Sequence, residues 1–112
     1  MKEYLFSYGT LQQKEVQLKL FGRLLSGEKD ILKGYKIVSI EINDESFLSN
    51  GGLKQQRIAI LSDNPAIFTE GAVFEITMEE LLRADTYEPY EYARIKVILE
   101  SGKQAWVYVA QS

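Results

Sequence analysis

The chain has 112 residues, of which 46% are hydrophobic and 26% charged, and this size and composition predict one globular domain over residues 1–112. It contains no cysteine and no histidine, which excludes Ser-His and Cys-His nucleophilic catalysis, thiol redox chemistry and the usual zinc sites. The net charge of −3 argues against a nucleic-acid partner, and no run approaches the roughly 20 apolar residues that cross a bilayer. We therefore expect a cytoplasmic protein with no bound metal and no membrane contact.

The first predicted element is a largely buried strand over residues 3–8, which mixes aromatic and apolar side chains and stops at Gly9. Because glycine tolerates positive φ, a sharp turn at Gly9 would leave successive backbone N–H groups unpaired and pointing outward. Such a turn can hold an anion or a carbonyl oxygen. Tyr-Gly-Thr is also an ordinary strand exit, so both interpretations remain open at this point.

A helix, a strand and a loop are predicted next. Apolar residues recur at helical spacing between Val16 and Leu25, interrupted by Gly22, and this pattern predicts one short helix. Residues 34–42 alternate polar and apolar side chains, the pattern of a half-buried strand. Polar residues and two glycines over 43–56 predict a surface loop with little structure of its own, either a mobile flap or a tolerated insertion.

The second half of the chain combines strands with one well-marked helix. The sequence Thr77-Met78-Glu79-Glu80 fits a capping box, so a helix should begin there and end before Pro89. Several strands with two or so short helices predict an α+β fold whose mixed, mainly antiparallel sheet closes into a small barrel. The strands predicted in this half cover residues 57–61, 71–76, 92–99 and 104–109, the last two as a β-hairpin.

Residues 84–94 gather three tyrosines, three acids and one arginine around the predicted end of this helix. An acid held between Tyr87 and Tyr90 and fixed by Pro89 would be partly desolvated, which raises a carboxyl pKa towards the range useful for proton transfer. Glu88 is therefore a candidate general base and acid. The alternative is that these acids are solvated and that Arg94 forms a surface ion pair with one of them.

Four short motifs occur in order along the chain and together resemble those of the γ-glutamylcyclotransferase-like family, also called the AIG2-like family. The resemblance covers nearly the whole chain and implies a small mixed barrel with a pocket. The turn after the first strand would form one wall of this pocket, and Glu88 would project into it. The motifs are Tyr8-Gly9-Thr10-Leu11, Leu32-Lys33-Gly34-Tyr35, the run 71–76, and Ala84-Asp85-x-Tyr-Glu88 followed by Tyr92-x-Arg94.

The reaction that the resemblance implies is an intramolecular ring closure. The α-amine of a γ-glutamyl group attacks its own γ-carbonyl, which yields 5-oxoproline and an amine, so the enzyme needs no nucleophile, metal or cofactor. Glu88 would move the proton, and backbone N–H groups of the 9–11 turn would bind the developing oxyanion and the α-carboxylate, with a hydroxyl added by Tyr8. The implied substrate-binding residues are Tyr8, Gly9, Thr10 and Leu11, and possible pocket residues are Tyr87, Tyr92 and Arg94, the last mainly part of the scaffold.

The implied partner is a small-molecule γ-glutamyl substrate whose leaving group stays open. Many relatives have a basic, glycine-containing stretch after the first motif, whereas this chain has Gln12-Gln13-Lys14-Glu15, and Ala84 stands where leucine is common. The first departure affects substrate identity more than fold, and the second removes packing volume. Alternatives from other classes are a non-catalytic small-ligand or protein-interaction domain on the same fold, and an oligomerisation module. Oligomeric state is open too.

Overall fold

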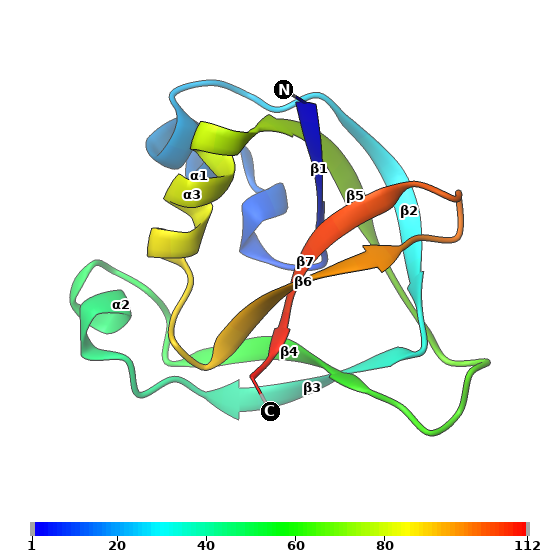
Figure 1. The fold of residues 1–112 in the computed structure, drawn as a ribbon. Coiled ribbons are helices and arrows are strands. Elements are labelled where there is room, and N and C mark those ends of the chain that lie inside the picture. The colour runs from blue at the N-terminus through cyan, green and yellow to red at the C-terminus, as the bar shows by residue number, and fades with distance from the viewer. Residues whose placement is uncertain (1, 112) are drawn as a thin grey trace.

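The computed structural model describes residues 2–111, and in it two sheets lie beside a group of helices (Figure 1). The elements in chain order are β1 (Lys2–Ser7), the 3₁₀ turn η1 (Thr10–Gln12), α1 (Lys14–Phe21), β2 (Gly27–Lys33), β3 (Tyr35–Glu41), α2 (Glu45–Ser49), β4 (Gln55–Leu61), β5 (Phe68–Thr77), α3 (Met78–Tyr87), β6 (Tyr92–Ile98) and β7 (Gln104–Ala110). One sheet has five strands in the order β2-β5-β1-β7-β6, and the other is a two-stranded ribbon of β3 and β4.

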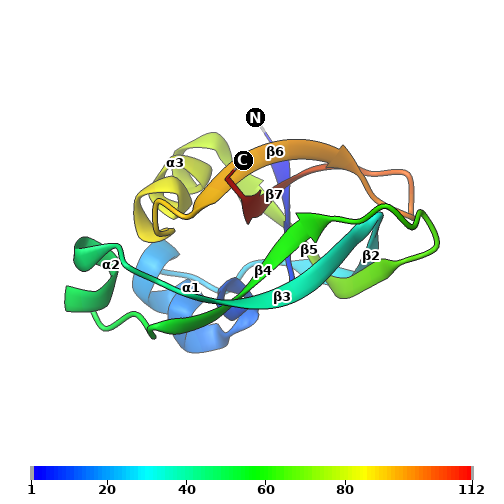
Figure 2. The ribbon, with the colours of Figure 1, turned by 90° about the horizontal axis from the view of Figure 1, so that it is seen from below.

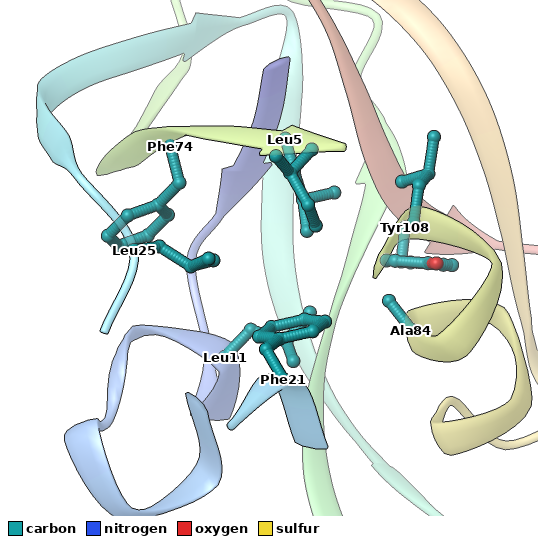
Figure 3. Packing of buried hydrophobic residues seen from close by; sticks show 9 residues of the cluster. Leu5, Leu11, Phe21, Leu25, Phe74, Ala84 and Tyr108 are labelled. Carbon is teal, nitrogen blue, oxygen red and sulfur yellow. The ribbon is translucent and has the colours of Figure 1, made fainter. Parts of the chain in front are cut away.

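β1 is the central strand of the larger sheet, pairing antiparallel with β5 and parallel with β7. Because successive side chains of a strand point to opposite faces, Leu5 packs with residues of α1 and α3, whereas Phe6 packs with residues of β3 and β4. Figure 3 shows Leu5 above Phe21, with Phe74 and Tyr108 on either side. Burial on both faces explains why the sequence of this strand has no polar and apolar alternation.

The predicted barrel is wrong, because the sheets do not close on one another. β3 and β4 pair antiparallel with each other along their whole length, while β2 and β6 remain the edges of the larger sheet. The chain leaves that sheet at Gly34, a single residue between β2 and β3 with φ +83. The ribbon then crosses the larger sheet and packs against β7 (Figure 2). The α+β class and the antiparallel-rich pairing are confirmed.

Strand β2 was not predicted, because only two of its side chains, Asp30 and Leu32, are buried. It is an edge strand whose pairing with β5 uses backbone groups, so most of its side chains face water. Strands are recognised in a sequence by the alternation of apolar and polar residues, which reflects burial of one face. β2 has too few buried side chains to show this alternation.

The helices also differ from prediction at two places. α1 ends at Phe21, because Gly22 adopts φ +73 and its N–H closes the helix on the Leu18 carbonyl, so Leu25 lies outside. The loop expected over 43–56 contains α2, whose first N–H groups are capped by the carboxylate of Asp44. No helix among residues 2–111 is both long and apolar enough to span a membrane.

α3 begins with the predicted capping box, in which the Glu80 N–H donates to Thr77 Oγ1 at 3.1 Å and the Thr77 N–H donates to Glu80 Oε1 at 3.0 Å. Arg23 also donates twice to the Glu80 carboxylate, at 2.7 and 2.8 Å. The Arg23 hydrogen bonds outweigh partial burial and lower the pKa of Glu80 to about 2. This fixed N-terminus sets the position of the helix whose far end carries Glu88.

Gly71 of β5 lies against the end of β1, where only a glycine fits. A methyl group at this position would collide with the Ser7 carbonyl oxygen and lie 2.7 Å from Phe6 Cζ. We expect Gly71→Ala to lower the free energy of unfolding by about 1–3 kcal/mol, because the two strands must move apart. Chemical denaturation measures this, and a loss below about 0.5 kcal/mol would mean that the strands separate without strain.

Candidate active site

A narrow pocket opens where β1 ends, between the turn that follows it, the start of β4 and the segment after α3. Its volume is about 30 Å³. The residues around it come from parts of the chain that are far apart in sequence, so only the tertiary structure creates it. They are Phe6, Ser7, Tyr8, Gly9, Thr10 and Leu11 from the first strand and turn, Gln56 and Arg57 from β4, and Glu88, Tyr92 and Tyr108.

The turn at residues 9–11 presents backbone donors without using positive φ. Gly9 has φ −134, so the expected left-handed turn is wrong, and its N–H donates to Ser7 Oγ at 3.2 Å. Thr10 and Leu11 open the 3₁₀ turn, whose first N–H groups have no intrahelical partner. Within residues 2–111 neither N–H donates a hydrogen bond, so two of the three expected donors are free.

The hydroxyl of Tyr8 is committed to the protein and does not serve as the expected extra donor to the pocket. It donates to the Tyr108 carbonyl at 2.6 Å and accepts from the Ala59 N–H at 3.0 Å. Burial raises the pKa of this phenol, so it keeps its proton. Tyr8 lines the pocket while holding β4 against β7, which fixes the wall that carries Arg57.

Glu88 is the C-cap of α3, where its extended backbone and the following Pro89 end the helix. Its N–H donates to the Ala84 carbonyl at 3.1 Å, and its half-buried side chain lines the pocket. Burial, and then the nearby charge of Asp85, raise the pKa of this carboxyl to about 8. No hydrogen bond among residues 2–111 involves the carboxyl, so its oxygens are available to a ligand.

Asp85 lies behind Glu88 in a hydrogen-bonded cluster that also contains Arg94 and Tyr108. Arg94 donates to the two Asp85 oxygens at 2.7 and 2.9 Å, and the Tyr108 hydroxyl donates to Oδ1 at 2.6 Å. Burial alone would raise the pKa of Asp85, but these donors lower it below its ordinary value. Arg94 also stacks 4.4 Å from the centre of the Trp106 ring, so it belongs to the scaffold and does not line the pocket.

The other two tyrosines singled out from the sequence hold the pocket walls together. The Tyr87 hydroxyl lies 3.1 Å from Thr10 Oγ1, outside the pocket lining, and joins the end of α3 to the turn. The Tyr92 hydroxyl lines the pocket and donates to the Arg57 carbonyl at 2.7 Å, which joins β6 to β4.

The 43–56 segment is docked against the residues around Glu88. The second carboxylate oxygen of Asp44 accepts the Tyr90 N–H at 2.9 Å, and Glu91 Oε2 accepts the Asn43 N–H at 2.6 Å. The Phe47 ring meets the Tyr87 ring edge-on at 5.9 Å. The prediction of little structure is therefore wrong, because tertiary contacts order a segment whose local composition is that of a loop.

Five residues line the pocket that were not assigned to the site from the sequence, namely Phe6, Ser7, Gln56, Arg57 and Tyr108. Arg57 Nη1 donates to the Tyr8 carbonyl at 3.4 Å, a long hydrogen bond, and the residue as a whole is exposed. The only sequence signal for Arg57 was a charged residue at the start of the apolar run 57–61, which does not by itself indicate a binding site. No group of three or more carboxylates that could hold a metal ion occurs among residues 2–111.

Known proteins resemble this chain over nearly its whole length. A family model described as gamma-glutamyl cyclotransferase, AIG2-like, matches residues 5–112. A solved structure titled gamma-glutamyl cyclotransferase has a TM-score of 0.72 at 16% identity, covering 100% of this chain and 68% of its own. An Arabidopsis thaliana protein solved in solution has a TM-score of 0.69 at 18% identity, with coverage of 98% and 62%.

YkqA from Bacillus subtilis has a TM-score of 0.67 at 22% identity, over 99% of this chain and 36% of its own. This chain thus spans less than two thirds of the Arabidopsis protein and little more than a third of YkqA. No curated protein sequence matches it. At such identities the structural matches establish a common fold.

Proposed function

The chain belongs to the γ-glutamyl cyclotransferase, AIG2-like family, and from this membership we propose that it converts the γ-glutamyl group of a small amine, amide or peptide to 5-oxoproline. The α-amine nitrogen attacks the γ-carbonyl carbon, the bond from that carbon to the leaving nitrogen breaks, and the released amine takes up the proton that the α-amine loses. Nucleophile and electrophile belong to one molecule, so the protein has to fold the substrate, move one proton and stabilise an oxyanion.

Glu88 is assigned the proton transfer. A general base is most effective when its pKa is close to the working pH, and the pKa of this carboxyl, near 8, meets that condition. The substrate reacts as its free α-amine, and the carboxylate accepts the proton that this nitrogen loses as it attacks and returns that proton to the leaving nitrogen. Its free oxygens in the pocket are the single observation that carries the proposal.

The free N–H groups of Thr10 and Leu11 are assigned to the γ-carbonyl oxygen as it gains charge. Donors that are already oriented and have no competing partner stabilise a developing oxyanion without reorganising. The hydrogen bonds within the 3₁₀ turn, from Gln12 to Gly9 at 3.1 Å and from Gln13 to Thr10 at 2.9 Å, hold these donors in place. Gly9 shapes the turn, and its own N–H is used by Ser7.

The test is to incubate the purified protein with a panel of γ-glutamyl dipeptides and γ-glutamyl amines and to measure 5-oxoproline. We expect release from at least one member, with kcat/KM rising with pH through an apparent pKa near 8, because only ionised Glu88 can accept the proton. An N-acetylated version of the best substrate is the control, since its α-nitrogen cannot attack. A folded protein that releases no 5-oxoproline from the whole panel would contradict the proposal and favour a non-catalytic binding domain.

A further inference from the structure

A second cavity, which we call the helix pocket, lies between α1, the end of α3, and α2 with the turn that follows it (Figure 1). Its volume is about 370 Å³, within the range of small-molecule sites, whereas the active-site pocket measures about 30 Å³. The two cavities have no lining residue in common. The helix pocket is therefore a separate place, which the proposed reaction does not use.

Apolar side chains form most of the walls of the helix pocket. Val16 and Leu20 are four residues apart on α1, so they lie on the same face of that helix. Phe47 of α2 and Tyr87 at the end of α3 add two aromatic rings, which meet edge-on at 5.9 Å. A protein interior normally fills spaces larger than a water molecule, so apolar walls around a space of this size form a binding surface for an apolar group.

Backbone forms the wall that follows α2, at two consecutive glycines. Gly51 has φ +92, and a methyl group on Gly52 would lie 2.3 Å from Phe47 Cε2. The Gly52 N–H donates to the Phe47 carbonyl at 3.0 Å, and the Gly51 N–H donates to the Leu48 carbonyl at 3.2 Å. These contacts hold the turn against the Phe47 ring, so this wall is formed before any ligand arrives.

The polar groups of the helix pocket favour an anion. Lys19 is the one charged side chain that lines it, and within residues 2–111 no ion pair involves Lys19. The Thr86 hydroxyl donates to the Arg83 carbonyl at 2.7 Å, and the Asn50 amide donates to the Ser46 carbonyl at 2.9 Å. A cationic ligand would meet no carboxylate here, whereas an anionic one would meet an ammonium group that has no partner.

We infer that the helix pocket binds a small carboxylate with an apolar, ring-containing body. The carboxylate pairs with the exposed ammonium group of Lys19, and the body packs between the apolar side chains of α1 and the Phe47 ring. The ligand also contacts Tyr87, whose hydroxyl lies 3.1 Å from Thr10 Oγ1 in the wall of the active-site pocket. The site is thus one side chain away from the active-site turn, although the inference does not depend on the proposed reaction.

The experiment is an NMR titration of the whole chain with 3-phenylpropionate, in which the backbone N–H signals of Gly51 and Gly52 report on the helix pocket and that of Gly9 on the active site. 3-Phenylpropionamide has nearly the same shape without the charge, and acetate has the charge without the ring. We expect saturable shifts of the Gly51 and Gly52 signals with 3-phenylpropionate. The amide should bind about 5-fold more weakly, as expected for one exposed ion pair, and acetate should cause no saturable shift.

Two variants test the walls and the charge separately. Val16→Phe places a ring in the helix pocket and should abolish the saturable shifts with both aromatic compounds. Lys19→Gln should lower the affinity for 3-phenylpropionate to that for the amide. Lys14→Gln, at an exposed lysine of α1 outside the lining, is the matched control and should leave both affinities unchanged.

The inference is overturned if 3-phenylpropionate causes no saturable shift, or shifts only the Gly9 signal. Equal affinities for acid and amide, or an unchanged affinity in Lys19→Gln, would also overturn it, because the pocket would then not select a carboxylate. Binding that persists in a folded Val16→Phe variant would place the ligand elsewhere. Each of these results is independent of whether the protein forms 5-oxoproline.

Discussion

Replacing Glu88 by Gln is expected to lower kcat/KM for 5-oxoproline formation by about 10²–10⁴-fold, the usual contribution of a general acid–base group. Glutamine has nearly the same shape but cannot accept the proton that the α-amine loses as it attacks. The substrate should still bind, because the backbone donors of the turn are unchanged. The rise of the rate through an apparent pKa near 8 should disappear with the carboxyl. Glu15→Gln, on an exposed side of α1, is the control and should keep full activity.

The same substitution should make the protein more stable at alkaline pH. The pKa of Glu88 is about 8 in the folded protein against an ordinary value of 4.5, so between these pH values the folded chain keeps a proton that the unfolded chain has lost. Stability therefore falls as pH rises through this window and levels off above it. We expect Glu88→Gln to raise the free energy of unfolding by about 2–4 kcal/mol at pH 9, and by much less at pH 4.

Urea denaturation at the two pH values measures this difference. Glu80 and Asp85 have lowered pKa values, so their protonation destabilises the protein only at more acidic pH. This effect is the same in Glu88→Gln and in the parent protein, so it cancels in the difference between them. An unchanged difference between variant and parent at pH 4 and pH 9 would mean that Glu88 is solvated and has no raised pKa. If Glu88→Gln is more stable than the parent protein but inactive, the carboxyl of Glu88 lowers stability and is needed for activity, as is common for active-site residues.

Removing the carboxylate of Asp85 is expected to have the second-largest effect, on the fold itself. Asp85→Ala leaves the Arg94 guanidinium and the Tyr108 hydroxyl without their shared acceptor in a partly buried place. Breaking a fully buried ion pair costs about 3–5 kcal/mol, and with side-chain exposures of 20% and 33% we expect about 2–4 kcal/mol here. Glu79→Ala, which breaks the exposed pair with Arg83, is the control and should cost less than about 1 kcal/mol.

Asp85→Asn tests the same cluster by its effect on Glu88. The amide keeps the shape of the side chain but removes the negative charge that helps to raise the pKa of Glu88. The pH dependence of kcat/KM should therefore move to lower pH. A purely structural role for Asp85 would lower stability and leave the pH profile in place, and a shift to higher pH would contradict the electrostatic argument.

The amino-acid sequence by itself determined those features that depend on neighbouring residues. The capping box at Thr77 and Glu80, the end of a helix before Pro89, the alternating strands and the β-hairpin near the C-terminus are all encoded within a few positions. The absence of cysteine and histidine limited the possible chemistry, and the crowded segment around Glu88 identified the candidate base. The helix and strand predictions are confirmed because local backbone preference and side-chain period act over short distances, whereas the role of Glu88 stays a prediction.

The tertiary structure alone decided which of these residues share a site and what state they are in. The bond between the Tyr8 hydroxyl and the Tyr108 carbonyl joins residues 100 positions apart, and the contact of Thr10 with Tyr87 spans 77 positions. Burial by residues distant in sequence raises the pKa of Glu88. The Tyr8 hydroxyl is bound to the Ala59 N–H, and the packing of β4 places Arg57 in the pocket wall.

The same reason explains the errors of architecture. β2 is held by backbone pairing with β5, which leaves almost no trace in its side chains, and the departure of the chain at Gly34 keeps the sheets from closing. The order of the 43–56 segment comes from Asp44 and Phe47 contacting residues after α3. Desolvation, ion pairing and sheet closure depend on tertiary contacts between residues that are far apart in the chain. A single sequence does not show which residues form these contacts.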